Sequence, residues 1–155
     1  MEAENTWSMS RVLTTFLLLV ALAPDPSAAR GLATETLEMN PDFRDARSHI
    51  AAGRFPQAIA LLMNLRDDYP PSPEISNWIA YSHRKMKDYS TSKAFYDEAL
   101  SINPNYLPAL EYQGEWLIET GDIESARKNL ARLKTLCGEC HEYKDLAESL
   151  AKYGR

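Results

Sequence analysis

The sequence has no run of basic residues, and its charge balance is acidic. It carries 17 Lys and Arg against 22 Asp and Glu, a net charge of −5. Proteins that bind nucleic acid or anionic membranes rely on basic surfaces, so this balance argues against both classes. Glycine is scarce, at six residues, and 45% of the residues are apolar, which excludes collagen-like and disordered classes. The length fits one globular domain.

Catalytic motifs are missing as well. The sequence contains no nucleophile elbow, no phosphate-binding glycine loop and no metalloprotease helix motif. The carboxylates fall on the expected solvated faces of helices. We therefore expect a protein that is not an enzyme, with no catalytic residue and no metal.

The longest apolar run lies near the N-terminus. Arg11 is followed by uninterrupted uncharged, mostly apolar residues from Val12 to Ala23. This length matches the hydrophobic region of a signal peptide and is too short to span a bilayer. The alternative is a buried helix of the fold, which the absence of a polar face disfavours. The run predicts export, and with it a periplasmic or secreted protein without a stable membrane span after cleavage.

Small residues mark a cleavage site after this run. Ser27 and Ala29 occupy the −3 and −1 positions of a cut before Arg30. This predicts a signal peptide over residues 1–29 and a linker over 30–38. An acidic N-terminus is unusual for a signal peptide, and two points stay open: the start, at Met1 or Met9, and a second possible cleavage after Ala23.

A spacing of 34 residues organises the rest of the chain. Pro70 and Pro104, each at the expected end of a helical segment, lie 34 residues apart, the period of one class of helical repeat. The same spacing recurs at small residues of the first helices and at the turns between paired helices, where glycine can take the left-handed conformation that ends a helix. These positions are Ala46, Ala80 and Gly114, and Gly53 to Phe55, Lys87 to Tyr89 and Gly121 to Ile123.

The pattern resembles exported tetratricopeptide repeat (TPR) proteins of bacteria, most clearly from Trp78 to Pro104. The resemblance implies an all-α fold, a right-handed solenoid of three helix pairs at residues 39–72, 73–106 and 107–140. A last amphipathic segment at 141–155 predicts a capping helix, because Tyr143, Leu146, Leu150 and Tyr153 fall on one face.

The resemblance also implies a concave groove, built from the first helix of each pair, that binds a segment of a partner protein. One hypothesis is a groove with cations in the first two repeats and anions in the third, suited to a peptide of mixed charge. The alternative is that Arg84 and Lys85 pair with Glu115 and Glu119 across neighbouring helices. The implied groove positions are Asn40, Phe43, Arg47, Ile50, Asn77, Tyr81, Arg84, Lys85, Glu111, Glu115, Ile118 and Glu119.

The segment Cys137-Gly-Glu-Cys140-His141 holds the only two cysteines. In an oxidising compartment Cys137 and Cys140 can form a disulfide, which is the interpretation we favour. Cys-x-x-Cys-His is also the attachment motif of haem c, with His141 as iron ligand and Met86 or His83 as the sixth ligand. A thiol redox pair is a third possibility. Zinc is disfavoured, because a structural site needs four ligands.

Overall fold

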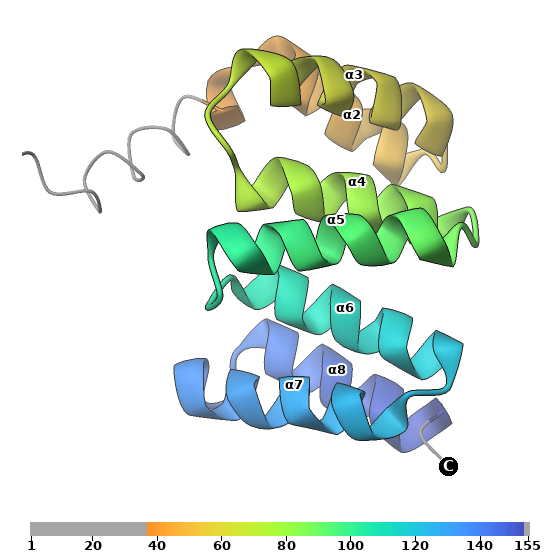
Figure 1. The fold of residues 1–155 in the computed structure, drawn as a ribbon, viewed down its shortest axis with the longest axis vertical. Helices are drawn as coiled ribbons and strands as arrows, with labels where there is room; N and C mark the ends of the chain where they lie inside the picture. The colour runs from red at the N-terminus through yellow and green to blue at the C-terminus, as the bar shows by residue number, and fades with distance from the viewer. Residues whose placement is uncertain (1–36, 154–155) are drawn as a thin grey trace, which may run out of the picture.

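The computed structural model describes residues 37–153, and these residues contain helices but no strand. The predicted signal peptide and residues 30–36 of the linker lie outside the described residues. The helices run antiparallel to their sequence neighbours (Figure 1). In order they are α2 (Pro41–Ala51), α3 (Phe55–Asp68), α4 (Pro73–Lys85), α5 (Tyr89–Ile102), α6 (Leu107–Thr120), α7 (Ile123–Cys137) and α8 (His141–Tyr153).

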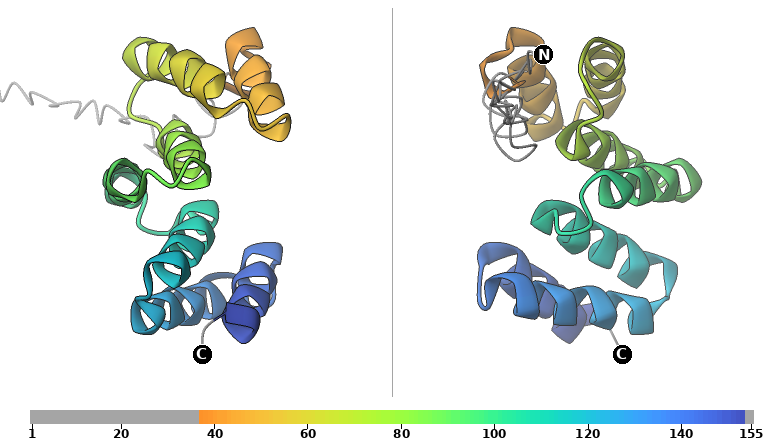
Figure 2. Two further views of the ribbon diagram at one scale, coloured as in Figure 1. Left: turned by 90° about the vertical axis from the view of Figure 1, so that its right-hand side faces the viewer. Right: turned by 60° about the vertical axis from the view of Figure 1, so that its left-hand side comes forward.

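The helices form three pairs and a cap, stacked along one axis as a right-handed solenoid. The pairs are α2 with α3, α4 with α5 and α6 with α7, and α8 packs on both helices of the third pair. The first helices of the pairs and α8 lie on one side of the stack, and α2 and α8 project farther than α4 and α6 (Figure 2, left). The predicted all-α fold is confirmed.

Local signals start and end these helices. Side chains of Asn40, Ser72, Asp88 and Asp122 accept hydrogen bonds from backbone N–H groups of the first turns of α2, α4, α5 and α7. Four helices also have proline in the first turn, where its missing N–H costs nothing. The turns inside the pairs are left-handed, with φ of 71° at Gly53, 63° at Lys87 and 89° at Gly121.

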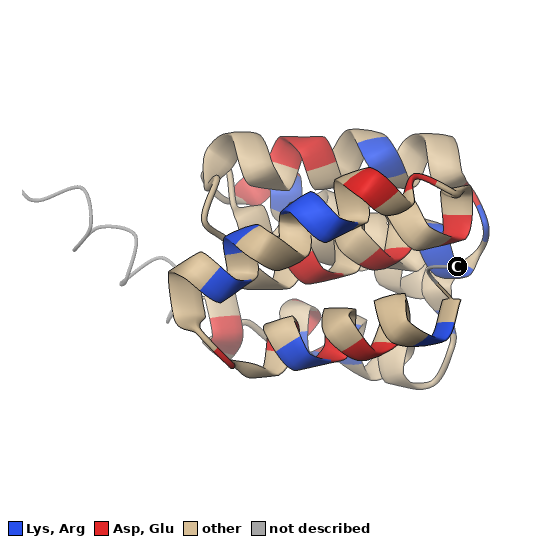
Figure 3. Ribbon diagram, turned by 90° about the horizontal axis from the view of Figure 1, so that it is seen from below, with Lys and Arg blue, Asp and Glu red and all other residues tan. Residues whose placement is uncertain are grey.

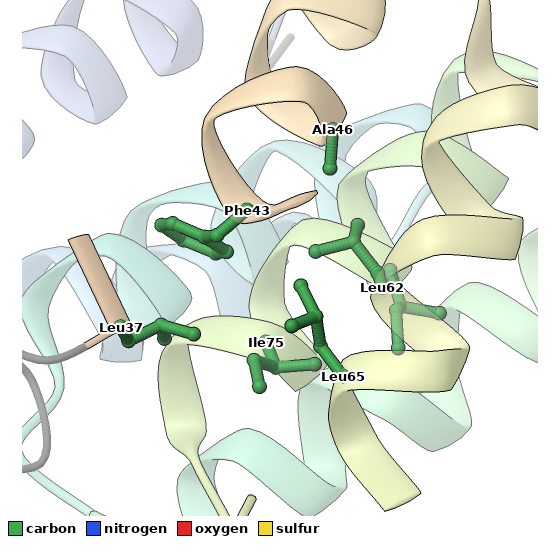
Figure 4. Packing of buried hydrophobic residues seen from close by; sticks show 7 residues of the cluster. Leu37, Phe43, Ala46, Leu62, Leu65 and Ile75 are labelled. Atoms are coloured by element: carbon green, nitrogen blue, oxygen red, sulfur yellow. The ribbon is translucent and has the colours of Figure 1, made fainter. Parts of the chain in front are cut away.

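The core is divided between the two ends of the stack. One cluster joins α2, α3 and α4, and its packing includes Phe43 and Leu37, which are 0% and 2% exposed (Figure 4). The second cluster joins α6 and α7 to α8 through Leu146, which is 0% exposed, and Leu150. Each pair alone would expose an apolar face, so neighbouring pairs and the cap stabilise one another.

The cap approaches α6 closely at Gly114. A Cβ atom at this glycine would lie 2.5 Å from Cδ2 of Leu146, so the space of the missing side chain is filled by the cap. Tyr143 packs against the same cluster. Tyr153, which the sequence places on the same face of this helix, is 59% exposed in the last turn of α8.

Within residues 37–153, no helix is both long enough and apolar enough to cross a membrane. The apolar run at residues 12–23 lies outside this part of the chain. Charged residues of both signs are interspersed along the helices seen from the α7–α8 end of the stack (Figure 3).

Candidate binding groove

Cavities of the described residues lie on the side of the stack formed by the first helices and α8, and two of them contain predicted groove residues from more than one repeat. The first, of about 460 Å³, we call the Arg84 pocket. It is lined by Arg84, Lys85, Glu115, Ile118, Glu119, Ser149 and Tyr153. The second, of about 340 Å³, we call the acidic pocket. It is lined by Glu38, Arg47, Glu74, Asn77, Trp78, Tyr106, Pro108, Glu111, Tyr112, His141, Glu142 and Asp145.

Arg84 is held by the neighbouring repeat. Its side chain is 3% exposed, and its two terminal nitrogens lie 2.5 Å from Glu115 and 2.8 Å from Glu119 on α6. The alternative in which Arg84 pairs across helices is thus what the structure shows. Lys85 does not join this network. Its ammonium lies 5.6 Å from the centre of the Tyr81 ring, and its side chain is exposed.

Arg47 is also neutralised within the chain. Its guanidinium lies 3.0 Å from the carboxylate of Glu38 and 5.8 Å from the centre of the Trp78 ring. Both arginines that were expected to give the groove its cations therefore already have acidic partners. Of the cations predicted for the first two repeats of the groove, only Lys85, at the C-terminal end of α4, has no acidic partner among the described residues.

Three predicted groove positions of the first repeat serve the fold instead. Phe43 is buried in the core, because the residues just before α2 bring Leu37 against it (Figure 4). Asn40 caps α2 and donates a hydrogen bond to the hydroxyl of Tyr69 at 3.0 Å. Ile50 packs on the same core cluster. Phe43, which was predicted to bind a partner, is therefore a core residue with no exposed side-chain surface in this structure.

Asn77 lines the acidic pocket, and its side-chain amide lacks hydrogen-bond partners. It is 0% exposed, and neither its amide oxygen nor its amide nitrogen has a hydrogen-bond partner among the described residues. Buried amides in folded proteins are almost always hydrogen-bonded, because leaving one unpaired costs about 1–3 kcal/mol. An unpaired buried amide that lines a cavity is therefore a candidate ligand contact.

Two carboxyl groups of the acidic pocket hold their protons unusually tightly. Burial, together with the nearby carboxylates of Glu115, Asp145 and Glu142, raises the pKa of Glu111 to about 8. Burial and the adjacent carboxylate of Glu38 raise the pKa of Glu74 to about 7. No cation lies within ion-pair distance of either carboxylate among residues 37–153.

Aromatic side chains connect the helices of the groove. Tyr81 lies 5.6 Å from Trp78 and 5.1 Å from Tyr112, measured between ring centres, and Trp78 lies 6.0 Å from Tyr112. All three rings are partly exposed. The groove prediction contained Tyr81 but missed Trp78 and Tyr112. The signal was present, because these two residues occupy the same position in consecutive 34-residue repeats.

The cap also belongs to the groove, which the sequence prediction did not include. Helices α4, α6 and α8 begin at residues 73, 107 and 141, each 34 residues after the last. Asn77, Glu111 and Asp145 therefore occupy equivalent positions, and all three line the acidic pocket. The hydroxyl of Ser149 on α8 donates to Glu115 on α6 at 3.2 Å. Extending the 34-residue spacing from α6 into α8 would have predicted Asp145 and Ser149 as groove residues.

The cysteine segment lies where α7 meets α8. The sulfur atoms of Cys137 and Cys140 are 2.06 Å apart, at disulfide distance. The ring of His141 is exposed and lies 2.8 Å from Asp145. His83 and Met86 lie at the end of α4, which is the opposite side of the stack from the start of α8 (Figure 1). The geometry therefore does not bring these two candidate haem ligands to His141.

Comparison with protein families identifies the repeats. Residues 43–72 and residues 73–106 each match a family model described as tetratricopeptide repeat. The chain therefore carries tetratricopeptide repeats in its first two helix pairs, and the third pair continues the same architecture. The sequence matches no curated protein.

Solved structures similar to this chain include three structures of TPR domains. The first TPR of Spaghetti (RPAP3) bound to the HSP90 peptide SRMEEVD superposes with a TM-score of 0.60 at 19% identity, over 70% of this chain and 89% of that one. The first TPR domain of human RPAP3 gives 0.61 at 18%, over 81% and 97%. The complex of the TPR2B domain of yeast Sti1 with pHsp70 gives 0.65 at 14%, over 79% and 97%.

Proposed function

We propose that this tetratricopeptide-repeat protein is a non-enzymatic binding module whose concave groove holds a segment of a partner protein. The observation that carries the proposal is the acidic pocket beside the Arg84 pocket, with the buried and unpaired amide of Asn77 in its wall. A bound backbone can supply the hydrogen bonds that this amide lacks in the free protein.

The aromatic residues of the groove support the same proposal. Trp78, Tyr81 and Tyr112 form a partly exposed cluster on α4 and α6. Aromatic side chains of this kind give large contact areas at a small entropic cost and often dominate binding energy in protein interfaces. Two of the similar TPR structures are complexes, one with an HSP90 peptide and one with pHsp70. They support a peptide or protein ligand for this fold without indicating which one.

Export is part of the proposal. The pattern of residues 1–29 supports a signal peptide and thus a periplasmic or secreted location. We also propose that Cys137 and Cys140 are paired there, because disulfides form and persist in oxidising compartments. We propose no bound cofactor, since the haem alternative receives no support from the placement of His83 and Met86.

A peptide selection tests the groove. Random dodecapeptides are selected by phage display on the purified protein, and the enriched peptides are titrated by fluorescence polarisation. We expect the double variant Tyr81→Ala, Tyr112→Ala to bind them at least 10-fold more weakly, because it loses the exposed aromatic contact area. Lys128→Ala on α7 is the control. Its side chain is 69% exposed and lies outside both pockets.

Circular dichroism of both variants checks that the helices are retained. If the selected peptides bind the groove variant and the Lys128 variant with the affinity of the unchanged protein, the groove is not the binding site and the proposal fails.

A further inference from the structure

The acidic pocket is richer in negative charge than the fold requires. Of its five carboxylates, Glu38 pairs with Arg47 and Asp145 pairs with His141. The other three, Glu74, Glu111 and Glu142, have no cation within ion-pair distance among the described residues. Like charges that share one pocket destabilise the folded state unless a cation joins them.

Stabilisation of helix N-termini explains only some of the carboxylates in the acidic pocket. Glu74 and Glu142 lie in the first turns of α4 and α8, where acidic residues stabilise a helix through its dipole. Glu111 lies in the second turn of α6 and is 7% exposed. Helix stabilisation does not account for a buried carboxylate at this position. Nor does it account for Asn77, which holds the equivalent position of α4 and has two unpaired amide atoms.

We infer that the acidic pocket binds a basic side chain, the ammonium of lysine or the guanidinium of arginine, of the partner segment held in the groove. This inference rests on the proposed function and specifies its ligand class. A cation bound near Glu74, Glu111 and Glu142 neutralises the three carboxyl groups of the pocket that have no cationic partner among the described residues. The amide oxygen of Asn77 accepts a hydrogen bond from the cation, and its amide nitrogen donates to a backbone carbonyl of the segment.

Other cations fit the pocket less well. Among residues 37–153, no group of three or more potential metal ligands is arranged to hold a metal ion. A free polyamine would satisfy the carboxylates, but it would leave the aromatic cluster and the adjoining Arg84 pocket without a role. A longer peptide with one basic residue contacts the carboxylates, the aromatic cluster and the Arg84 pocket together. The two pockets are close enough for this, because Glu111 of the acidic pocket and Glu115 of the Arg84 pocket lie one turn apart on α6.

The raised pKa of Glu111 makes cation binding in the acidic pocket depend on pH. The charged groups that face this carboxyl are Glu115 on the same helix, Asp145 and Glu142 on α8 and Arg84 on α4. Because a bound cation favours the ionised carboxylate, the pKa of Glu111 falls on binding and a proton is released. Affinity for a basic peptide therefore increases between pH 6.5 and 8.5, whereas lysine and arginine stay charged throughout.

The test compares three fluorescein-labelled octapeptides of alternating alanine with lysine, glutamate or glutamine, titrated at 150 mM salt. We expect the lysine peptide to bind at least 10-fold more tightly than the glutamate peptide. Glu111→Gln should weaken the lysine peptide at least 5-fold and reduce the rise of affinity with pH. Glu124→Gln on α7, with a side chain 81% exposed, removes the same charge and should change the affinity less than 2-fold.

Several results would overturn the inference. If the glutamate peptide binds more tightly, or if the two glutamine variants weaken the lysine peptide equally, the pocket has no preference for a cation. If spermidine displaces the labelled peptide at the concentration at which the unlabelled peptide does, the ligand is a small amine. In the first two cases the groove proposal stands as long as Tyr81→Ala, Tyr112→Ala still weakens peptide binding at least 10-fold. Insensitivity of all three peptides to that double variant would overturn both claims.

Discussion

At the scale of single residues, the groove keeps carboxyl groups where burial opposes their charge. Glu111 is the clearest case, with a pKa raised to about 8 from 4.5. Between these two values the unfolded chain has released the proton and the folded chain still holds it. The free energy of unfolding therefore decreases as the pH rises from 4.5 to about 8, and below pH 4.5 Glu111 does not lower it. A carboxyl that weakens the fold at neutral pH is more easily explained by ligand binding than by structure.

The variant Glu111→Gln tests this ionisation directly. We expect it to be more stable than the unchanged protein at pH 8.5, by on the order of 2–3 kcal/mol, because it removes a charge that is poorly solvated. At pH 5.5 the difference should shrink towards zero, since the folded protein then holds the carboxyl neutral and most of the cost is absent. Urea unfolding at pH 5.5, 7 and 8.5 measures it. A difference that does not vary with pH would show that Glu111 titrates normally.

Lys87 is the one non-glycine residue with positive φ among the described residues. The equivalent turns of the first and third pairs have Gly53 and Gly121, for which this conformation carries no steric cost. A left-handed residue with a side chain costs about 1–2 kcal/mol, partly offset by the lower flexibility of its unfolded chain. We predict that Lys87→Gly stabilises the protein by roughly 0.5–1 kcal/mol, measured by urea unfolding.

The matched change is Gly121→Ala, which should destabilise the protein by roughly 1 kcal/mol through backbone strain alone. A new Cβ at Gly121 would have no atom within 4 Å, so the change in stability reports backbone strain without a steric clash. Destabilisation by Lys87→Gly would mean that this turn relaxes in solution.

At the scale of elements, α8 has two roles, as the cover of the third pair and as a wall of the groove. Leu146 carries the first role, since it is fully buried against α6 and α7. Leu146→Ala should cost about 2–5 kcal/mol, the usual effect of emptying a packed leucine site. Leu136→Ala is the control, because Leu136 is 40% exposed on α7 and its loss should change stability by no more than about 0.5 kcal/mol. Equal effects of the two changes, measured by thermal unfolding, would contradict the assignment of α8 as the cap.

The sequence was sufficient to predict the helix pairs, because their signals are local and repeated. Glycine turns, small residues and prolines at a spacing of 34 determine where each helix begins and which face is buried. Side-chain partners could not be derived in the same way. Phe43 faces the groove in register but is covered by Leu37, which comes from a segment expected to be a linker. Burial of Arg84 likewise depends on its contact with α6.

At the scale of the whole molecule, the stack presents one hollowed side built from α4, α6 and α8. Its charge is uneven. The carboxylates that α4, α6 and α8 contribute to the acidic pocket lie in the first two turns of these helices, and Lys85, which forms no ion pair among residues 37–153, lies at the C-terminal end of α4. A segment bound along the groove would therefore have a preferred direction, with its basic residue at the acidic pocket. This refines the expectation of a mixed-charge ligand, since the two groove arginines, Arg47 and Arg84, already have acidic partners, whereas three carboxyl groups of the acidic pocket have no cationic partner among the described residues.

The most direct measurement of peptide binding in the groove uses the two tryptophans of the stack. Trp78 lies in the groove, whereas the indole nitrogen of Trp116 donates to the backbone carbonyl of Tyr89 at 3.1 Å. In a ¹⁵N-labelled protein titrated with a peptide selected for binding, we predict that the indole N–H signal of Trp78 shifts and that of Trp116 does not. Each signal is assigned with a Trp→Phe variant. A shift of Trp116 together with amides of α5 and α7, with Trp78 unchanged, would contradict binding in the groove.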